Sequence, residues 1–209
     1  RIAITAAAIS GQDAILANEV AHPSYLGFDT GKYPGDDAMR AWRTGNSPYS
    51  WAGYYLKSPC HQDDGWMGKR ETLTAMDYGL AVLYVGQQTW GRRPGAPHME
   101  RVSVSKRVTW YVGRGRKRHK VTRTVTRTVL RKAGPPPAGA TCNADFVSGA
   151  RGMREGVDAA QTTAREGFPR GTTIFLDLER MDVLHQPMRD YYSAWVRAVL
   201  DDGRYVPGI

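Results

Sequence analysis

The sequence predicts an α/β fold in which parallel strands alternate with helices. Short, continuously apolar runs such as 80–86 are typical of strands that are covered on both faces of a parallel sheet. Apolar residues at helical spacing, for example Val157, Ala160 and Ala164, appear before the next apolar run begins. Because this alternation repeats along the chain, we expect either a doubly wound sheet or a (β/α)8 barrel.

The individual elements follow in order from local patterns. The first strand is a short run that ends near Asp29, and a helical pattern follows it. The second strand is rich in aromatic residues, and the third is strongly apolar. Gly167 is suited to end the long helix before the fourth strand, because glycine commonly terminates helices. The expected strands are 25–30, 51–56, 80–86, 172–178 and 204–209, and the expected helices are 35–43, 69–78, 149–167 and 188–200.

Two observations favour the barrel, in a shortened form. The segment Gly27 to Gly31 lacks the GxGxxG spacing of a dinucleotide-binding turn, which weakens the doubly wound alternative. A barrel usually needs about 200 to 250 residues, and this chain spends roughly sixty on an insertion. We therefore expect a (β/α)8 TIM-barrel type of fold, truncated after about four and a half βα units. Residues 1–22 are expected to be an N-terminal extension or the remnant of a secretion signal, and 23–209 the partial barrel.

The insertion, 91–148, carries most of the positive charge. Between 101 and 132 there are twelve Lys or Arg and no Asp or Glu, which leaves 17 basic against 20 acidic residues elsewhere. Residues 103–112 and 120–130 have strand-like patterns, and the stretch between them predicts a long hairpin loop. A basic β-hairpin is therefore expected on a mildly acidic body. Since two strands alone are marginally stable, it should be mobile or lean on a partner.

Composition narrows the class of protein further. A hydrophobic fraction of 41% suits a globular protein. The sequence contains no apolar run of about eighteen residues, so we expect no membrane span. Two cysteines, Cys60 and Cys142, are too few for a structural zinc site, and we expect no metal and no cofactor. The two cysteines could form one disulfide or remain as two free thiols, and the sequence is compatible with both. A disulfide would imply a secreted or extracytoplasmic protein.

Polar side chains gather where the expected strands end. In α/β folds the carboxyl ends of parallel strands carry the working residues. Asp29 ends the first strand, whereas Asp177 and Glu179 end the fourth, where strand geometry places both acids on one face. Such a rim suits a sugar, because hydroxyls pair with carboxylates and amides while apolar sugar faces stack on aromatic rings. The other residues expected to bind substrate are Tyr54, Tyr55, Lys57, Gln87, Gln88 and Trp90.

The two acids of the fourth strand predict acid–base chemistry on a glycosidic bond. This chemistry needs two carboxyl groups about 5 to 9 Å apart, and strand residues i and i+2 lie roughly 6.6 to 6.8 Å apart at the backbone. Glu179 has the longer reach and is the expected proton donor, whereas Asp177 is expected to stay ionised, with Asp29 assisting. The alternative is structural: both acids bond loop amides or pair with Arg180 and Lys57.

These residues resemble a known family. The motifs are Gly27-Phe28-Asp29, Phe175-Leu176-Asp177-Leu178-Glu179 and Gly203-Arg204-Tyr205-Val206-Pro207-Gly208-Ile209, and they resemble bacterial glycoside-hydrolase-like domains related to family-25 lysozymes. The resemblance covers about 25 to 90 and 149 to 209. It implies a (β/α) barrel that cleaves the glycan strands of peptidoglycan, with Asp29, Asp177 and Glu179 in the groove and the glutamate as general acid. The basic insertion departs from the family pattern.

Three functions are compatible with the sequence. The preferred one is a secreted glycoside hydrolase, or hydrolase-like protein, that acts on cell-wall polysaccharide. The second is a non-catalytic wall-binding module. The third is a polyanion-binding protein that acts through 101–132 and attracts teichoic acid, anionic peptidoglycan or nucleic acid. Because the hairpin leaves from the carboxyl end of the third strand, we expect it on the same rim as the acids.

Overall fold

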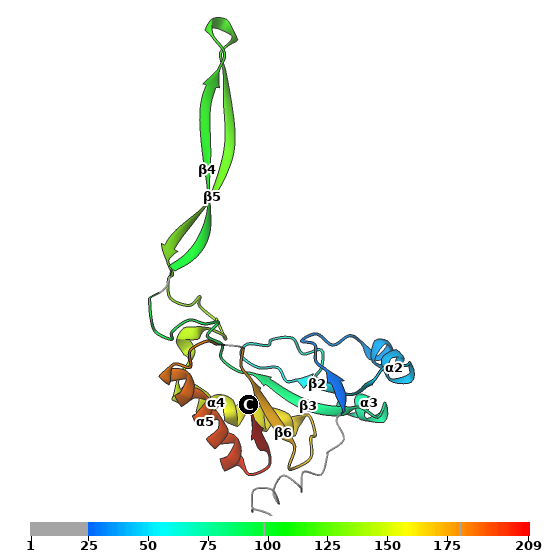
Figure 1. Cartoon of the computed structure of the whole chain (residues 1–209). Helices are drawn as coiled ribbons and strands as arrows, with labels where there is room; N and C mark the ends of the chain where they lie inside the picture. The colour runs from blue at the N-terminus through cyan, green and yellow to red at the C-terminus, as the bar shows by residue number, and fades with distance from the viewer. Residues whose placement is uncertain (1–24, 98, 180) are drawn as a thin grey trace, which may run out of the picture.

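The structure is a computed structural model that describes residues 25–97, 99–179 and 181–209 (Figure 1). The expected extension at 1–22 lies outside the described residues. The strands are β1 (Leu26–Phe28), β2 (Tyr49–Tyr55), β3 (Gly79–Val85), β4 (Met99–Val112), β5 (His119–Lys132), β6 (Thr173–Asp177) and β7 (Val206–Gly208). The helices are α2 (Asp36–Thr44), α3 (Arg70–Ala75), α4 (Gly149–Arg165) and α5 (Gln186–Asp202), with 3-10 turns η1 (Gly115–Lys117) and η2 (Ala144–Phe146).

The body is built on a parallel sheet with the strand order β1-β2-β3-β6-β7. Each strand pairs with the next strand of this sheet along the chain, so every crossover advances in the same direction. Right-handed crossovers that advance in one direction place all connecting helices on one face of the sheet. A doubly wound sheet reverses its order and carries helices on both faces, so this topology differs from that class.

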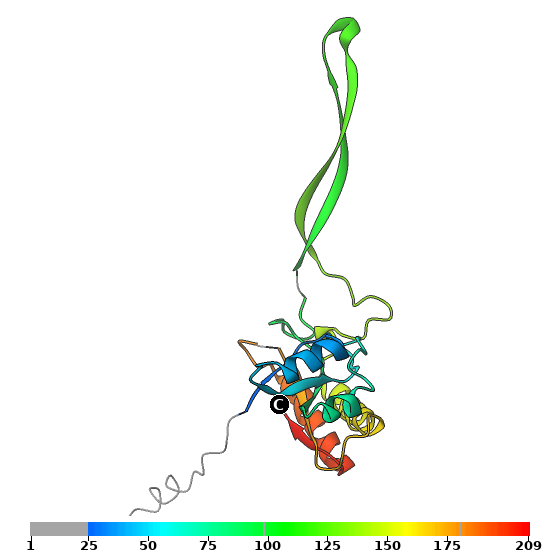
Figure 2. The ribbon, with the colours of Figure 1, turned by 90° about the vertical axis from the view of Figure 1, so that its right-hand side faces the viewer.

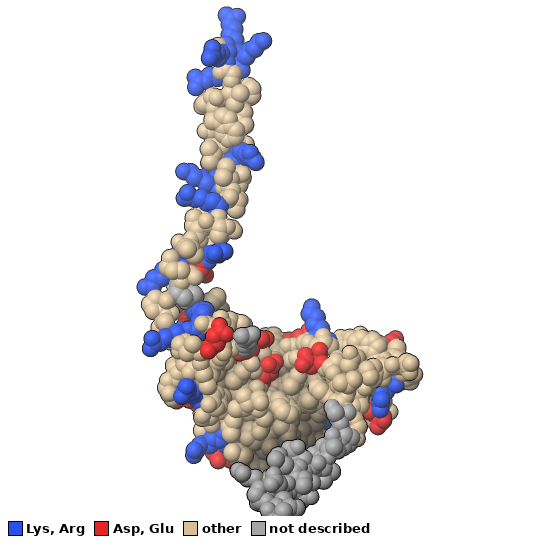
Figure 3. Space-filling view, viewed as in Figure 1, with Lys and Arg blue, Asp and Glu red and all other residues tan. Residues whose placement is uncertain are grey.

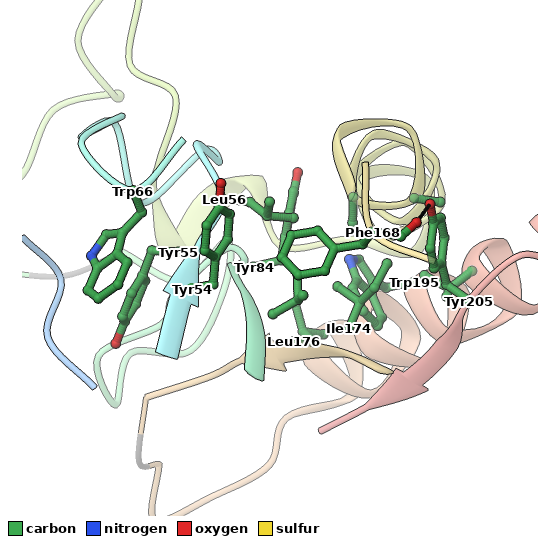
Figure 4. Packing of buried hydrophobic residues seen from close by; sticks show 14 of the residues in the cluster. Tyr54, Tyr55, Leu56, Trp66, Tyr84, Phe168, Ile174, Leu176, Trp195 and Tyr205 are labelled. Carbon is green, nitrogen blue, oxygen red and sulfur yellow. Dashed lines mark hydrogen bonds between the residues drawn. The ribbon is translucent and has the colours of Figure 1, made fainter. Parts of the chain in front are cut away.

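The helix-covered face holds the core of the body. Tyr84 on β3, Ile174 on β6 and Trp195 on α5 are fully buried, and the rings of Tyr84 and Trp195 lie 6.3 Å apart. Figure 4 shows these side chains packed between the sheet and the helices. Burying one side chain of the size of Ile174 stabilises the fold by about 1.5–3 kcal/mol. The alternating register of the strands therefore fixes which face is covered.

Helices α4 and α5 pack closely against each other because of a glycine. A Cβ at Gly152 would overlap the backbone carbonyl of Tyr191, so any larger residue would push the helices apart. Ser148 caps α4 by accepting a hydrogen bond from the backbone N–H of Arg151 (3.3 Å), and Gly203 ends α5 in the left-handed conformation at φ 71°. Local capping and one small residue thus position the pair beneath the sheet.

The opposite face of the sheet is open. Paired residues of neighbouring strands share a face, and Leu83 on β3 is in register with Phe175 on β6. Phe175 is 37% exposed and Val206 on β7 is 48% exposed, whereas Ile174 and Leu176, the sequence neighbours of Phe175, are buried. None of the described helices covers this face. It leads directly to the edge at which the strands end.

The insertion forms a two-stranded antiparallel ribbon. Strands β4 and β5 have 14 residues each and pair from Met99 with Lys132 to Val112 with His119. At about 3.4 Å per residue, each strand spans roughly 45 Å. Figures 1 and 2 show the ribbon extending away from the body, so almost all of its side chains face solvent. The expected hairpin is confirmed, and both arms are longer than predicted.

The other expected strands and helices are confirmed within a few residues. The closed (β/α)8 barrel is not found: the described residues form an open sheet of five parallel strands, fewer than the eight that close such a barrel. β1 and β7 are the two edges of this sheet. In the described part of the chain, no helix is long and apolar enough to cross a membrane.

Candidate active site

Three acidic residues lie at the carboxyl edge of the sheet. Asp29 directly follows β1, Asp177 is the last residue of β6, and Glu179 lies two residues further along. Figure 3 shows acidic side chains along this rim of the body, below the ribbon. Gly53 on β2 makes room for the first acid, because a Cβ at this position would lie 2.7 Å from the Cβ of Asp29. The parallel sheet therefore gathers the three predicted acids at one edge.

Tyr55 links the acids. It is the last residue of β2, it is 8% exposed, and its hydroxyl donates a hydrogen bond to Oδ1 of Asp29 (3.2 Å). Burial raises the pKa of Tyr55, and the negative charges of Asp29, Asp177 and Glu179 raise it further. The phenol is thus within electrostatic reach of all three carboxyl groups and stays neutral as a hydrogen-bond donor.

Asp177 is the half-buried acid of the group. Burial raises the pKa of Asp177, and the neighbouring charges of Glu179 and Asp29 add to this increase, while His61 opposes it. Asp177 therefore keeps its proton to a higher pH than an ordinary aspartate. The expectation that Asp177 stays ionised remains a prediction, and the raised pKa opposes it.

His61 belongs to the site, although no sequence motif indicates a role for it. Its ring lies against that of Tyr55, with 4.9 Å between the ring centroids. Burial lowers the pKa of His61, while the charges of Asp63 and Asp177 oppose this shift, so the ring favours its neutral form. Its Nε2 atom is buried and has no hydrogen-bond partner among the described residues. The only sequence signal was its place in the loop after the strand that carries Tyr55.

Gln88 holds the end of β6 in place. Its amide nitrogen donates to the backbone oxygen of Asp177 (2.8 Å), and its amide oxygen accepts from the backbone N–H of Glu179 (2.8 Å). Gln88 is 2% exposed. It therefore positions the two acids through their backbone rather than presenting its amide to a substrate.

Gln87 is likewise used internally. Its amide nitrogen donates to Glu155 (2.8 Å) and to the backbone oxygen of Thr141 (2.9 Å), and its oxygen accepts from the backbone N–H of Asn143 (3.0 Å). The side chain is fully buried. Gln87 thus ties the returning end of the insertion to α4.

A cavity of about 270 Å³ opens beside the acids. Asp29, Tyr55 and Asp177 line its polar part, and apolar residues line the rest. The apolar residues that complete its wall are Leu83, Phe175, Leu176, Leu178 and Ile209. A polar end beside an apolar floor suits a ligand with hydroxyl groups and an apolar face, as a sugar ring has.

The remaining predicted substrate residues lie elsewhere. Tyr54 is fully buried on the helix-covered face, where its hydroxyl bonds the carboxylate of Glu166. Lys57 pairs with Asp64 (3.7 Å) and lines a larger cavity, of about 510 Å³, toward α4. Trp90 is 56% exposed in the segment that leads to the ribbon. Tyr54 is turned away from the acids because neighbouring residues of a strand point to opposite faces.

A disulfide joins Cys60 and Cys142, with their Cα atoms 4.9 Å apart. It connects the loop that carries His61 to the segment by which the ribbon returns to the body. Asp145 adds to this anchor, because its carboxylate pairs with Arg92 (3.6 Å) and accepts from the backbone N–H of Gly95 (3.2 Å). The root of the ribbon is therefore fixed beside the acidic edge.

The acids do not form a recognisable metal site. Among the described residues, no group of three or more His, Cys, Asp or Glu side chains is arranged to hold a metal ion. The site is therefore best described by its carboxyl groups, one phenol and one imidazole.

Comparison with known protein families gives a match over most of the chain. No curated protein and no solved structure matches this chain significantly. Residues 40–209 match the family model described as Rv2525c-like, glycoside hydrolase-like domain. The matched range includes β6 with Asp177 and Glu179, as well as the whole ribbon, and begins after Asp29. The chain therefore belongs to the Rv2525c-like, glycoside hydrolase-like domain family.

Proposed function

We propose that the carboxyl edge of the sheet is a glycosidase site that binds and cleaves a glycan. The observation that carries this proposal is the electrostatic grouping of Asp29, Asp177 and Glu179 around the phenol of Tyr55. Hydrolysis of a glycosidic bond needs one carboxyl group that gives a proton and another that stabilises positive charge or activates the nucleophile. Membership of a glycoside hydrolase-like family supports this assignment.

Asp177 and Glu179 act in this proposal as a pair at the end of β6. Burial raises the pKa of Asp177, and the neighbouring charges of Glu179 and Asp29 raise it further. Glu179 is exposed at the rim and is the member that reaches the glycosidic oxygen, as predicted from the sequence. Asp29, also exposed and held by Tyr55, is the partner that faces developing positive charge at the sugar.

The proposed substrate is the glycan of the bacterial cell wall, and the proposed location is outside the cytoplasm. The substrate follows from the resemblance to domains related to family-25 lysozymes. The Cys60–Cys142 disulfide is compatible with an oxidising compartment. The one-directional strand order and one-sided helices support a barrel-type ancestry for the open sheet.

Release of reducing ends from purified peptidoglycan tests this proposal. Glu179→Gln and Asp177→Asn are expected to lower the rate by about 100-fold or more, which is the usual contribution of an acid–base group. Glu71→Gln on α3 and Asp201→Asn on α5 are matched controls, because both residues are exposed and distant from the acidic edge. Equal rates for the wild type and both site variants would contradict the proposal.

A second candidate, a wall-binding module without turnover, is favoured by one observation. The cavity beside the acids is small, at about 270 Å³. For this candidate, the wild type sediments with peptidoglycan but releases no reducing ends, and Glu179→Gln changes neither result. The same assay therefore separates the two candidates.

A further inference from the structure

The ribbon carries positive charge that the protein itself does not neutralise. Twelve Lys or Arg lie between 101 and 132, without any Asp or Glu, and all twelve are exposed. Within the described residues, Glu100 is the carboxylate that pairs with a ribbon cation, at 3.7 Å from Arg131. Figure 3 shows basic side chains along the ribbon from its root to its turn. The charges are therefore available to an external anion.

The strand register distributes these charges evenly around the ribbon. Residues that pair directly across an antiparallel ribbon share a face, so the twelve cations divide into four on each face and four in the turn. Lys106, Arg123, Arg127 and Arg131 share one face; Arg101, Arg107, Lys120 and Lys132 share the other; and Arg114, Arg116, Lys117 and Arg118 occupy the turn. A flexible polyanion can therefore contact both faces and the turn at the same time.

The ribbon lacks a platform on which bases could stack. Its two large aromatic residues, Trp110 and Tyr111, are neighbours in β4 and therefore point to opposite faces. The guanidinium of Arg118 also lies over the Tyr111 ring, 4.7 Å from its centroid. Proteins that bind single-stranded nucleic acid stack successive bases on aromatic side chains, and this surface offers no adjacent pair.

One face of the ribbon instead carries hydroxyl groups. Ser105 pairs with Thr126 at 2.8 Å, and Thr109 pairs with Thr122 at 3.0 Å, through their side-chain oxygens. A hydroxyl donates one hydrogen bond and accepts two, so it suits both phosphate oxygens and the hydroxyl groups of a polyol. The full set on this face is Ser103, Ser105, Thr109, Thr122, Thr124, Thr126 and Thr128.

We propose that the ribbon binds a flexible wall polymer of polyol phosphate units. The twelve cations neutralise its phosphates, and the hydroxyl face contacts its polyol groups. The root of the ribbon is fixed beside the acidic edge by the Cys60–Cys142 disulfide and by Gln87. The acids of the edge repel a polymer of this charge, so the proposed binding site is the ribbon and not the edge. This binding does not depend on catalysis at the edge.

Binding of poly(glycerol phosphate) to the full chain tests the proposal. The variant R114Q/R116Q/K117Q/R118Q removes the four cations of the turn, which is solvent-exposed. Its affinity is expected to fall by about tenfold or more, and the slope of log affinity against log salt should become shallower by about 0.7 for each phosphate that the variant no longer neutralises. The matched control, R40Q/R154Q/R189Q/R197Q, removes four exposed charges from α2, α4 and α5 and should leave the affinity within about twofold.

A second variant tests the hydroxyl face without changing charge. Thr124→Val with Thr126→Val should weaken binding of poly(glycerol phosphate) but not of polyglutamate, which has charge but no polyol groups. Three results would overturn the proposal: equal losses in the turn variant and its control, affinity that does not depend on salt, or tighter binding of single-stranded DNA with the same number of phosphates. This test measures binding at the ribbon, whereas the glycosidase test measures turnover at the acidic edge, so the two tests fail independently.

Discussion

The acidic edge of the sheet and the basic ribbon hold their charges in opposite ways. At the edge, Asp177 is half-buried, and its pKa is raised by burial and by neighbouring acids. Gln88, 2% exposed, uses its amide to fix the backbone on which Asp177 and Glu179 stand. On the ribbon, the twelve cations are exposed and, except at the Glu100–Arg131 pair, have no carboxylate partner among the described residues.

Because the edge charges are partly buried and the ribbon charges are solvated, we expect the two regions to contribute differently to folding stability and to binding. A charge that is partly buried changes the free energy of folding when it is altered, because its environment differs between the folded and unfolded states. A solvated charge contributes little to folding and acts through long-range attraction. Substitutions at the edge should therefore affect stability and chemistry together, whereas substitutions on the ribbon should affect binding alone.

Removal of the disulfide should have the largest effect on stability. Cys60→Ser with Cys142→Ser opens a covalent loop with a sequence separation of 82 residues. The free energy of unfolding is expected to fall by about 2–4 kcal/mol, because the unfolded chain regains conformational freedom. Denaturant unfolding measures this change, and the wild type under reducing conditions should reproduce it. A loss below about 0.5 kcal/mol would show that the link between ribbon root and edge is dispensable.

Gln88→Leu should have the next largest effect. The substitution leaves the part-buried backbone oxygen of Asp177 and the N–H of Glu179 without their partner. Each unsatisfied group costs about 1–3 kcal/mol, so the unfolding free energy should fall by about that amount or more. Gln161→Leu on α4 is the matched control, since Gln161 is exposed. Equal stability of both variants would contradict the positioning role of Gln88.

Asp177→Asn should produce a stability difference that depends on pH. The pKa of Asp177 is raised in the folded protein, so the folded state binds the proton more tightly than the unfolded state. Its favourable contribution is complete below the unfolded pKa of about 4 and is lost as the pH rises through the folded value. The variant should therefore melt at a higher temperature than the wild type at about pH 7, and the difference should vanish near about pH 3. A constant difference between these pH values would contradict the burial of this acid.

Neutralising the ribbon should have the smallest effect on stability. The variant R114Q/R116Q/K117Q/R118Q changes exposed side chains of the turn. Its unfolding free energy should stay within about 0.5 kcal/mol of the wild type, because solvated surface charges contribute little. Thermal melting in low and high salt measures this. A larger loss would mean that the ribbon charges have structural partners.

The sequence predicted the individual strands and helices better than it predicted whether the sheet closes into a barrel. Apolar runs and helical spacing located the strands and helices, because burial imposes both patterns. Closure of a barrel depends on strand number and tilt, which no local pattern encodes. The disulfide was one of two open alternatives, because the distance between Cys60 and Cys142 depends on how their loops fold.

The sequence predicted the positions of those site residues that lie on strands or directly after them. Asp29, Asp177 and Glu179 were located by their positions at strand ends, which parallel pairing brings to one edge. Strand alternation also separates Tyr55, which faces the acids, from Tyr54, which faces the helices. His61 was missed because its position against Tyr55 results from the path of a loop.

The most direct test measures the release of reducing ends from two wall substrates, peptidoglycan with its phosphodiester polymers and the same material stripped of them. Glu179→Gln should abolish release from both substrates, because the acidic edge performs the chemistry. R114Q/R116Q/K117Q/R118Q should slow release only from the polymer-bearing wall, because the ribbon retains the enzyme there. No release by the wild type, or an equal effect of the ribbon variant on both substrates, would contradict this division of roles.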